Sequence, residues 1–290
     1  DWAWVNGVLK GEVMIDPQRP WVRWDGPEGS VVLRDLRVPT SGADRRHELA
    51  IQGPASRDIL LALGGSAEDL AEVRDLPWAG IVEVTLGDFN LLVSRTGYTG
   101  ERVAYELWVH PDRLVELWNT LLEIGEPFGL KPCGLAARDS LRIEAGLPLY
   151  GHEMDGPLNL TMGDAGFRTY VKLYKPFFVG REAFAASEHE RDAEGVRFRV
   201  TEKGQPRPQA LDPVVDDRGK VVGQVTSCAI DAEGYQLGQA YVRTSVKRRG
   251  TMLAVMVSPR RKPKPREELG MGDRVTLPVE IEVLGRFPRL

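Results

Sequence analysis

The sequence predicts an α+β fold in which a mixed α/β domain over residues 1–190 is followed by a small β-barrel domain over residues 191–290. The chain has 290 residues, which is long for one hydrophobic core and favours two domains. Helical and strand periodicities alternate up to about residue 190. Only short strand-like runs with regular turn signals follow that point.

The first predicted elements are a helix, a strand and a strand–helix pair. "DWAWVNGVL" places its apolar residues at helical spacing. "RWDGPEGSVVLRDL", residues 23–36, has turn residues before a β-branched run, which predicts a turn and then a strand. "LAIQGPASRDILLAL", residues 49–63, predicts a strand, a Gly-Pro turn and a helix.

Strands and helices continue to alternate through the rest of the first domain. Residues 81–95 hold two β-rich runs separated by Gly87 and Asp88, which predicts a hairpin. Residues 104–109 alternate as a strand does. "HPDRLVELWNTLLEIG" predicts a helix that ends near Gly125, and "GLAARDSLRIEA" predicts another that ends at Gly146.

The second domain is predicted from its strands. "SEHERDAEG", residues 187–195, is a charged segment that we expect to be a solvated link between the domains. The β-type runs after it favour a small barrel or sandwich of about 95 residues. These runs are "GVRFRV", "PVVD", "KVVGQVTSC", "GQAYV", "TMLAVMV" and "RVTLPVEIEVL".

Charge and composition favour a non-polymeric partner. The chain has 38 basic and 42 acidic residues, so its net charge of −4 gives no sign of nucleic-acid or membrane binding. No apolar run approaches the roughly 20 residues of a membrane span, and no signal peptide opens the chain. Two distant cysteines, Cys133 and Cys228, predict no disulfide or zinc site and suit a reducing, cytoplasmic setting with both thiols in the core.

Glu106 is the first candidate site residue, because it lies between Ala104 and Trp108 on a strand face that looks buried. An ionised carboxylate on an apolar face is costly unless it has a partner. One interpretation is an edge strand whose glutamate faces water. The other is a pocket carboxylate that accepts two parallel hydrogen bonds from the N–H and NH₂ edge of a heterocycle.

Arg138 is the second candidate, on the predicted helix 32 residues after Glu106. Its small and apolar neighbours make the guanidinium emerge from a non-polar stretch. Asp139 and Arg142 are spaced to form a surface pair. An ordinary helix salt bridge is therefore the stronger interpretation for Arg142 than for Arg138.

Three further clusters favour structural roles. His152, Glu153 and Asp155 in "GHEMD" fit no common metal spacing, and a loop or capping role is the stronger interpretation. Asp216 and Asp217 precede Arg-Gly and predict a hairpin turn rather than a carboxylate dyad. The basic run "PRRKPKPREE" predicts a solvated loop, with contact to an acidic protein as the alternative.

Several motifs in order resemble the aminomethyltransferase family, which includes the T-protein of the glycine cleavage system and folate-dependent demethylases. The motifs are "IQGPASRDIL", "SRTGYTGE", "ELWV", "GLKPCGLAARDSLRIEAGLPLYGHEMD" and "FVGREAF". The resemblance extends from the first residues to about residue 185 and resumes at "VGQVTS" and "GQAYV".

The resemblance implies a tetrahydrofolate-binding site formed by Glu106, Arg138 and Tyr98. Glu106 would bind the pterin edge, Arg138 would lie at the same pocket, and Tyr98 would pack near the pterin. The implied reaction transfers a one-carbon unit to tetrahydrofolate from a lipoyl carrier protein of the H-protein type. It needs no metal and no other cofactor.

The sequence also departs from the family pattern. Four residues separate Glu101 from Glu106 where the glycine-cleavage enzymes usually carry three, and we expect an enlarged turn to absorb the extra residue. Phe287 stands where those enzymes tend to have a tyrosine. No residue matches the family's catalytic aspartate, so we expect that Asp1 ends a Lys-Asp pair, that the N-terminal part is missing, and that no residue present is the catalytic acid.

Two other functions remain open. The first is a tetrahydrofolate-dependent demethylase that takes a methyl group from an N-, O- or S-methylated small molecule, which the extra residue before Glu106 and Phe287 both favour. The second is a non-catalytic folate-binding scaffold, which the absence of a Lys-Gly-Cys-Tyr motif disfavours. A dinucleotide-binding enzyme is disfavoured because no Gly-x-Gly-x-x-Gly follows a predicted strand.

Overall fold

The computed structural model describes residues 2–21, 31–258, 265–273, 275 and 277–288. The chain forms two compact units. The first comprises Asp1–Gly97, Glu101–Pro132 and Lys175–Arg181, and the second comprises Tyr98–Gly100, Cys133–Tyr174 and Glu182–Leu290. The predicted domain boundary at residue 190 stays a prediction. The units exchange short segments along the chain, so they do not follow one another in sequence.

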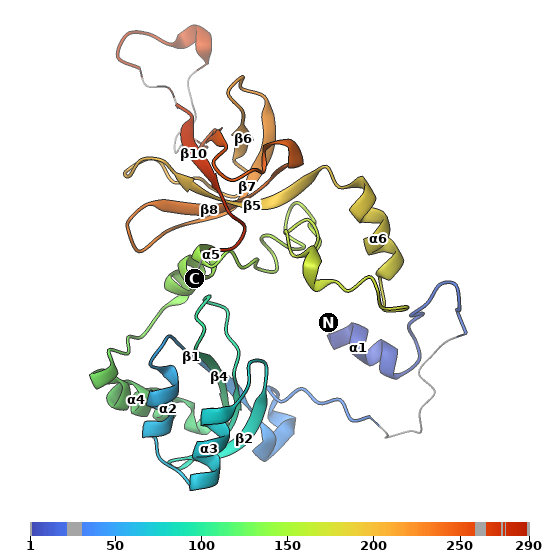
Figure 1. The fold of residues 1–290 in the computed structure, drawn as a ribbon, viewed down its shortest axis with the longest axis vertical. Coiled ribbons are helices and arrows are strands. Elements are labelled where there is room, and N and C mark those ends of the chain that lie inside the picture. The colour runs from blue at the N-terminus through green and yellow to red at the C-terminus, as the bar shows by residue number, and fades with distance from the viewer. Residues whose placement is uncertain (1, 22–30, 259–264, 274, 276, 289–290) are drawn as a thin grey trace. The chain divides into compact units, whose positions relative to one another are not determined.

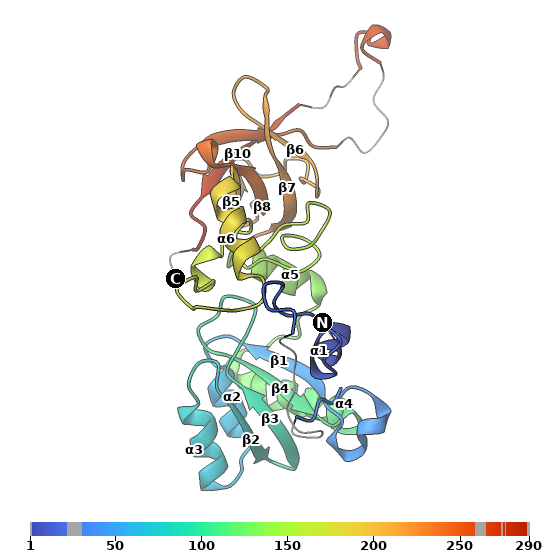
Figure 2. The same ribbon diagram turned by 90° about the vertical axis from the view of Figure 1, so that its right-hand side faces the viewer.

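The first unit is built on a four-stranded antiparallel sheet in the order β1-β4-β3-β2 (Figures 1 and 2). Its strands are β1 (His47–Gln52), β2 (Ile81–Leu86), β3 (Phe89–Ser94) and β4 (Ala104–Val109). Its helices are α1 (Trp2–Leu9), α2 (Ser56–Ala62), α3 (Ala67–Asp75) and α4 (Pro111–Gly125), with short 3₁₀ turns η1 (Pro39–Asp44) and η2 (Glu126–Phe128). The predicted helices, hairpin and strands over residues 47–125 are confirmed.

Local chemistry explains where these elements begin and end. Gly87 adopts a φ of +56° in the two-residue turn between β2 and β3, a conformation that glycine tolerates well. The hydroxyl of Ser66 caps α3 by accepting from the Asp69 amide at 3.0 Å. Pro111 starts α4 at a position where a missing amide costs nothing, and Gly129 turns left-handed after the 3₁₀ turn that follows this helix.

The core of the first unit lies on one face of the sheet. The β4 side chains Tyr105, Leu107 and Val109 are almost fully buried there with residues of α2 and α4. The face that carries Ala104, Glu106 and Trp108 is the opposite one. The face that looked buried in the sequence is therefore the less buried of the two, with Ala104 fully buried and Glu106 and Trp108 partly buried.

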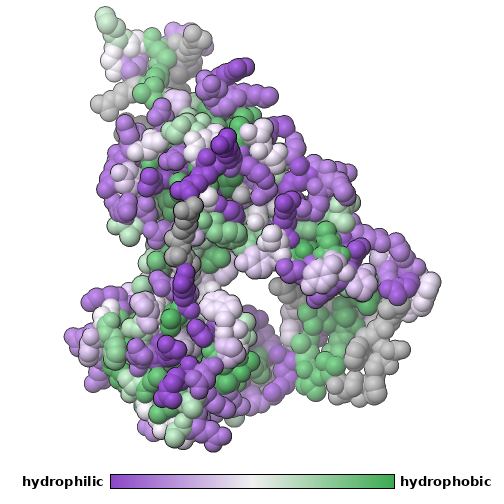
Figure 3. Space-filling view, in the orientation of Figure 1, coloured by the Kyte–Doolittle hydropathy of each residue, from purple (hydrophilic) through white to green (hydrophobic). Residues whose placement is uncertain are grey.

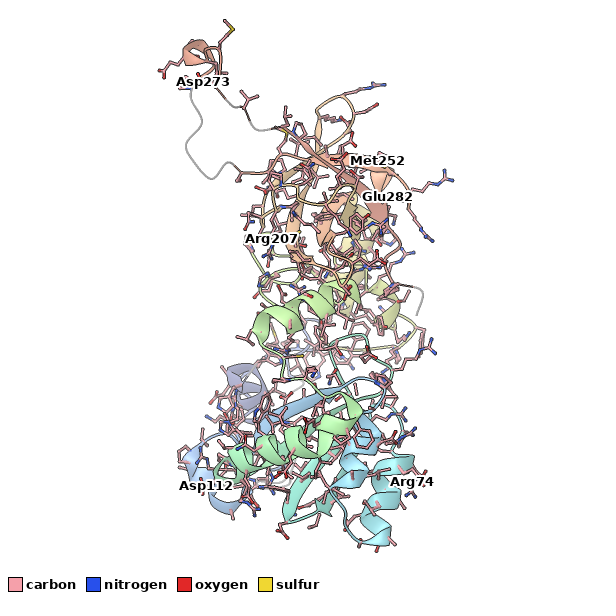
Figure 4. All side chains as sticks on the ribbon, turned by 90° about the vertical axis from the view of Figure 1, so that its left-hand side faces the viewer. Arg74, Asp112, Arg207, Met252, Asp273 and Glu282 are labelled. Atoms are coloured by element: carbon pink, nitrogen blue, oxygen red, sulfur yellow. The ribbon has the colours of Figure 1, made fainter. Side chains whose placement is uncertain are left out.

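The second unit contains a closed six-stranded barrel in the order β10-β5-β8-β7-β6-β9. The strands are β5 (Ala193–Val200), β6 (Pro213–Val215), β7 (Val221–Ile230), β8 (Gln236–Arg243), β9 (Met252–Val255) and β10 (Val279–Leu284). Met252 and Glu282 are cross-strand partners on β9 and β10 and mark this ladder in Figure 4. The predicted α+β class with a C-terminal barrel is confirmed.

Helices and turns accompany the barrel. They are α5 (Leu135–Glu144), α6 (Arg181–Glu190), which begins at the last residue of the first unit, and the 3₁₀ turns η3 (Arg168–Tyr170), η4 (Thr244–Val246) and η5 (Arg266–Glu268). Helix α5 contacts β7 and β8. The barrel core consists of side chains from all six strands, among them Phe198, Val255 and Ile281. The predicted hairpin at Asp216 is confirmed, since its carboxylate accepts from the amides of Arg218 and Lys220 at 3.0 and 2.9 Å.

Two predictions about local structure are wrong. Residues 31–36 form no strand: Val31 and Val32 are 48% and 75% exposed, and no strand of the described residues pairs with them. The charged segment 187–195 is no solvated link: it contains the end of α6 and the start of β5. Between them lies Arg191, whose side chain is 5% exposed and pairs with Asp164 at 2.9 Å and also with Glu188.

Some residues lie on the surface or outside the described part of the chain. Cys228 is buried as expected, but Cys133 is exposed, so the prediction of two core thiols is half wrong. Most of the basic run at residues 259–268 lies outside the described residues. The apolar surface over α1 includes Trp2, Trp4 and Val5, each between 44% and 49% exposed (Figure 3). No helix among the described residues has the length and apolar character needed to span a membrane.

Candidate functional site

Glu106 lies in the interior of the first unit's sheet. Its strand β4 is flanked by β1 and β3, and Glu106 pairs in register with Ala50 and Ser94. The edge-strand interpretation is therefore wrong. The β1–β4 ladder runs from His47↔Val109 to Gln52↔Ala104 without a register shift, so an extra residue before Glu106 is absorbed ahead of Ala104.

The Glu106 carboxylate is half-buried and held on one side only. Its Oε2 accepts a hydrogen bond from the hydroxyl of Thr96, which lies 3.0 Å from the hydroxyl of Ser94. No described protein donor contacts Oε1. Each carboxylate oxygen accepts more than one hydrogen bond, so this group has capacity for a ligand with two adjacent donors.

The turn before β4 depends on Gly97 and Gly100. A Cβ at Gly97 would lie 2.6 Å from the Cβ of Ala104 and would also meet the side-chain amide of Gln52. Gly100 has a φ of +87°, and a Cβ there would lie 2.5 Å from the Cβ of Ala145. The two glycines thus let the chain pass close to its neighbours on both sides of Tyr98 and Thr99.

Tyr98 belongs to the second unit and is anchored there by its hydroxyl. The Tyr98 Oη donates to the carbonyl oxygen of Pro148. Burial raises the pKa of the Tyr98 phenol, while the positive charges of Arg142, Arg286 and Arg138 act in the opposite direction. Because the hydroxyl is engaged with the backbone, the aromatic ring is the part of Tyr98 that remains for contact with a ligand.

Arg138 is exposed on the N-terminal half of α5. Leu135, Ala136 and Ala137 are also exposed, so an apolar surface surrounds this guanidinium as the sequence predicts. The Arg138 side chain has no hydrogen-bond or ion-pair partner among the described residues, and its charge acts on the Tyr98 phenol. Arg138 and Tyr98 thus belong to the second unit, whereas Glu106 belongs to the first.

Arg142 forms the predicted pair with Asp139, but its side chain is buried rather than on the surface. It is 2% exposed, and its Nη1 donates to Glu153 Oε2 at 2.6 Å. Its Nε donates to Asp139 at 2.7 Å, and its Nη1 also lies 3.3 Å from the carbonyl oxygen of Leu147. The helix spacing correctly paired Arg142 with Asp139, but the second carboxylate comes from the loop after the helix.

Glu153 is a structural residue whose full role the sequence did not predict. It is 3% exposed and also accepts from the amide of Leu149 at 2.9 Å, from Thr226 Oγ1 at 2.8 Å and from Ser227 Oγ. The loop and capping role expected for "GHEMD" is confirmed in that backbone contact. The two hydroxyls come from β7, more than 70 residues away, and no local pattern indicates them.

Phe287, at the C-terminal end of the second unit, provides an apolar edge. It is 47% exposed and meets Phe167 edge to face, with 5.3 Å between ring centroids. The described residues contain no group of three or more His, Cys, Asp or Glu side chains placed to hold a metal ion.

Comparison with known proteins gives consistent matches. A family model described as the GCVT N-terminal domain matches residues 30–175. The aminomethyltransferase of Streptomyces avermitilis is 41% identical over 207 residues, which are 70% of this chain and 53% of that protein. The aminomethyltransferase of Halothermothrix orenii is 34% identical over 247 residues, 84% of this chain and 64% of that protein.

A solved structure is similar as well. The crystal structure of glycine cleavage system aminomethyltransferase T from Bartonella henselae matches with a TM-score of 0.65 and 25% identity, over 83% of this chain and 59% of that chain. This chain spans about half the length of the curated relatives it matches, 53% and 48% for two of the most similar.

Proposed function

Because the chain belongs to the aminomethyltransferase family through its GCVT N-terminal domain, we propose that it acts as a tetrahydrofolate-dependent aminomethyltransferase of the glycine-cleavage T-protein type. Tetrahydrofolate is the acceptor of the one-carbon unit, and a lipoyl carrier protein of the H-protein type is the donor. The cytoplasm is the compartment we propose.

The observation that carries this proposal is the state of Glu106. It is a half-buried carboxylate on an interior strand, with one oxygen held by Thr96 and the other without a described protein partner. A pterin presents a ring N–H beside an exocyclic amino group, and a fixed carboxylate can accept from both. By resemblance to the family, Tyr98 and Arg138 of the second unit are further candidates for contact with tetrahydrofolate.

The proposed reaction needs orientation more than covalent chemistry. N5 of tetrahydrofolate attacks the methylene carbon of the aminomethyl group carried by the lipoyl arm, and ammonia leaves. N10 then bonds to the same carbon as its C–S bond breaks, which releases the dihydrolipoyl thiol and forms 5,10-methylenetetrahydrofolate. Holding the two reactants in an attacking geometry supplies a large effective concentration. The role of the residues named here is to fix the pterin so that N5 faces the donor, and none of them is assigned as the catalytic acid.

Replacing Glu106 by glutamine tests this proposal. Glu106→Gln keeps the size of the side chain but removes the charge that strengthens both hydrogen bonds, so we expect tetrahydrofolate affinity to fall about tenfold or more. Isothermal titration calorimetry measures the affinity. The matched control is Glu83→Gln, an exposed glutamate on β2 of the same sheet, which leaves the affinity unchanged. Equal affinity of wild type and Glu106→Gln would refute the assignment.

A tetrahydrofolate-dependent demethylase is the second candidate, and Phe287 favours it. This side chain and Phe167 form an apolar pair without a hydroxyl at a position where the glycine-cleavage enzymes tend to have a tyrosine. An N-, O- or S-methylated small molecule would then replace the carrier protein as donor. Ammonia release from aminomethyl-lipoyl carrier supports the first function, and formation of 5-methyltetrahydrofolate from a methylated donor supports the second.

A further inference from the structure

The second unit contains one buried and one partly buried arginine that form no ion pair with a described carboxylate. Arg197 on β5 is 7% exposed, and its Nη1 donates to the carbonyl oxygen of Gly285 at 3.3 Å. Arg286 directly follows Gly285 in the chain, and its Nη1 donates to Gln239 Oε1 at 2.8 Å. Neither guanidinium takes part in an ion pair with a described residue.

Several donors of this pair are unsatisfied. Arg197 Nε, Arg286 Nε and Arg286 Nη2 are buried and have no hydrogen-bond partner. Burial lowers the pKa of both arginines, that of Arg286 to about 10. At Arg286 the charges of Glu153 and Glu194 oppose this effect and that of Arg197 adds to it, and at Arg197 the charge of Glu144 opposes it, although none of these carboxylates forms an ion pair with either arginine. Buried cationic donors without partners are costly, so a missing counter-charge is the simplest physical explanation.

Two other arginines of the same unit differ in their ion pairs, although Arg142 Nη2 and Arg191 Nη2 are also buried without a hydrogen-bond partner. Arg142 is paired with Asp139 and Glu153, and Arg191 is paired with Asp164 and Glu188. Each of these two cations therefore has two carboxylates. Arg197 and Arg286 have only a backbone carbonyl and a neutral amide as acceptors.

Two glycines pack closely against the two arginine side chains. A Cβ at Gly146 would lie 2.8 Å from Arg197 Cδ, and a Cβ at Gly166 would lie 2.8 Å from Arg286 Nε. The Arg286 guanidinium carbon lies 4.8 Å from the centre of the Phe167 ring and 5.9 Å from that of Phe287. Because Phe287 is 47% exposed, the cluster is connected to the surface at this ring.

We propose that Arg197 and Arg286 form a binding site for the carboxylate of a small organic molecule. A guanidinium donates two parallel hydrogen bonds to a carboxylate, and the unsatisfied donors are of the required kind. The rings of Phe167 and Phe287 favour an organic anion over an inorganic one. The carboxylate has two candidate sources: an amino-acid methyl or aminomethyl donor, or the glutamyl tail of a folate. The second source rests on the function proposed above.

The test compares acids with their neutral amides on the full chain. The probes are N-methylglycine against N-methylglycinamide, p-aminobenzoylglutamate against its diamide, and inorganic phosphate, with affinity measured by calorimetry and thermal unfolding as a second readout. We expect at least one acid to bind wild type and its amide to bind about tenfold more weakly or not at all. The acid that binds identifies the source.

Variants locate the binding. Arg197→Gln and Arg286→Gln each weaken the acid's affinity about tenfold or more. The matched control is Arg199→Gln, two positions along β5, where the guanidinium stacks on Tyr235 at 5.0 Å. This control keeps wild-type affinity. If one of these variants does not fold, the difference in affinity between acid and amide on the wild-type chain still tests the proposal.

Three results would overturn the proposal: no acid binds wild type, acid and amide bind alike, or the two variants bind the acid as wild type does. Phosphate binding tighter than either acid would overturn the assignment to a carboxylate. The probes contain no pterin, so a lack of binding by them does not contradict the proposed tetrahydrofolate site. If Glu106→Gln leaves tetrahydrofolate affinity unchanged, the carboxylate site can still be tested with these probes.

Discussion

At the scale of single residues, Glu153 connects the loop after α5 to the barrel. Its carboxylate accepts from Arg142 on α5, from the Leu149 amide and from two hydroxyls of β7. The same loop offers the Pro148 carbonyl to Tyr98. The position of the Tyr98 ring therefore depends on a buried ion pair that itself touches no proposed ligand.

Removing this carboxylate is expected to destabilise the second unit strongly. Glu153→Ala leaves the Arg142 cation buried without its main partner, which costs about 3–5 kcal/mol. Urea denaturation measures the loss, with Asp155→Asn as the control on an exposed carboxylate of the same loop. The double variant Arg142→Met/Glu153→Leu is expected to recover much of the stability because no charge remains buried. A change below 1 kcal/mol for Glu153→Ala would contradict the role given to the pair.

At the scale of elements, the turn at residues 97–100 sets where β4 begins. Gly97→Ala would bring a new methyl group against Ala104 and the side chain of Gln52, and the strand start must shift to accommodate it. We expect a loss of about 1–3 kcal/mol in unfolding free energy together with weaker tetrahydrofolate binding. Gly134→Ala is the control, since nothing lies within 4 Å of a Cβ there. If the wild type and Gly97→Ala bind tetrahydrofolate with equal affinity, the turn at residues 97–100 does not position the proposed site.

Elements that depend on neighbouring residues in the sequence were predicted well. Elements and contacts that depend on residues far away in the sequence were not. The helix over Pro111–Gly125 and the hairpin at Gly87 follow from apolar spacing and turn chemistry carried by adjacent residues. The strand expected at residues 31–36 has no partner strand in the part of the chain that the structure describes, and Arg191 pairs with Asp164, 27 residues away. Neither strand pairing nor a long-range ion pair can be predicted from the local pattern of a single sequence.

The candidate site divides in the same way. Glu106 was identified from the alternation of its own strand. Its alternation did not show that the opposite face is the core, because the positions of α2 and α4 decide this. The importance of Glu153 follows from contacts with β7, and that of Arg197 from contacts at the far end of β10. Strand order, which local periodicity does not determine, brings these residues together.

At the scale of the whole molecule, the chain has two separate principal cores. One cluster lies against the sheet of the first unit and includes Leu107, and the other fills the barrel and includes Ile281. Chains with several compact units often unfold in more than one step. We therefore expect two transitions in differential scanning calorimetry of the full chain.

Substitutions in each core should affect different transitions. Leu107 and Ile281 are both almost fully buried, and truncating either to alanine costs about 2–5 kcal/mol. Leu107→Ala is expected to lower the midpoint of one transition, and Ile281→Ala that of the other. The controls are Ile81→Ala and Ile230→Ala, which remove side chains that are 60% and 58% exposed on strands of the same two units. A single transition lowered equally by both core variants would show that the two units unfold as one, and the effects of paired substitutions would then give the coupling between them.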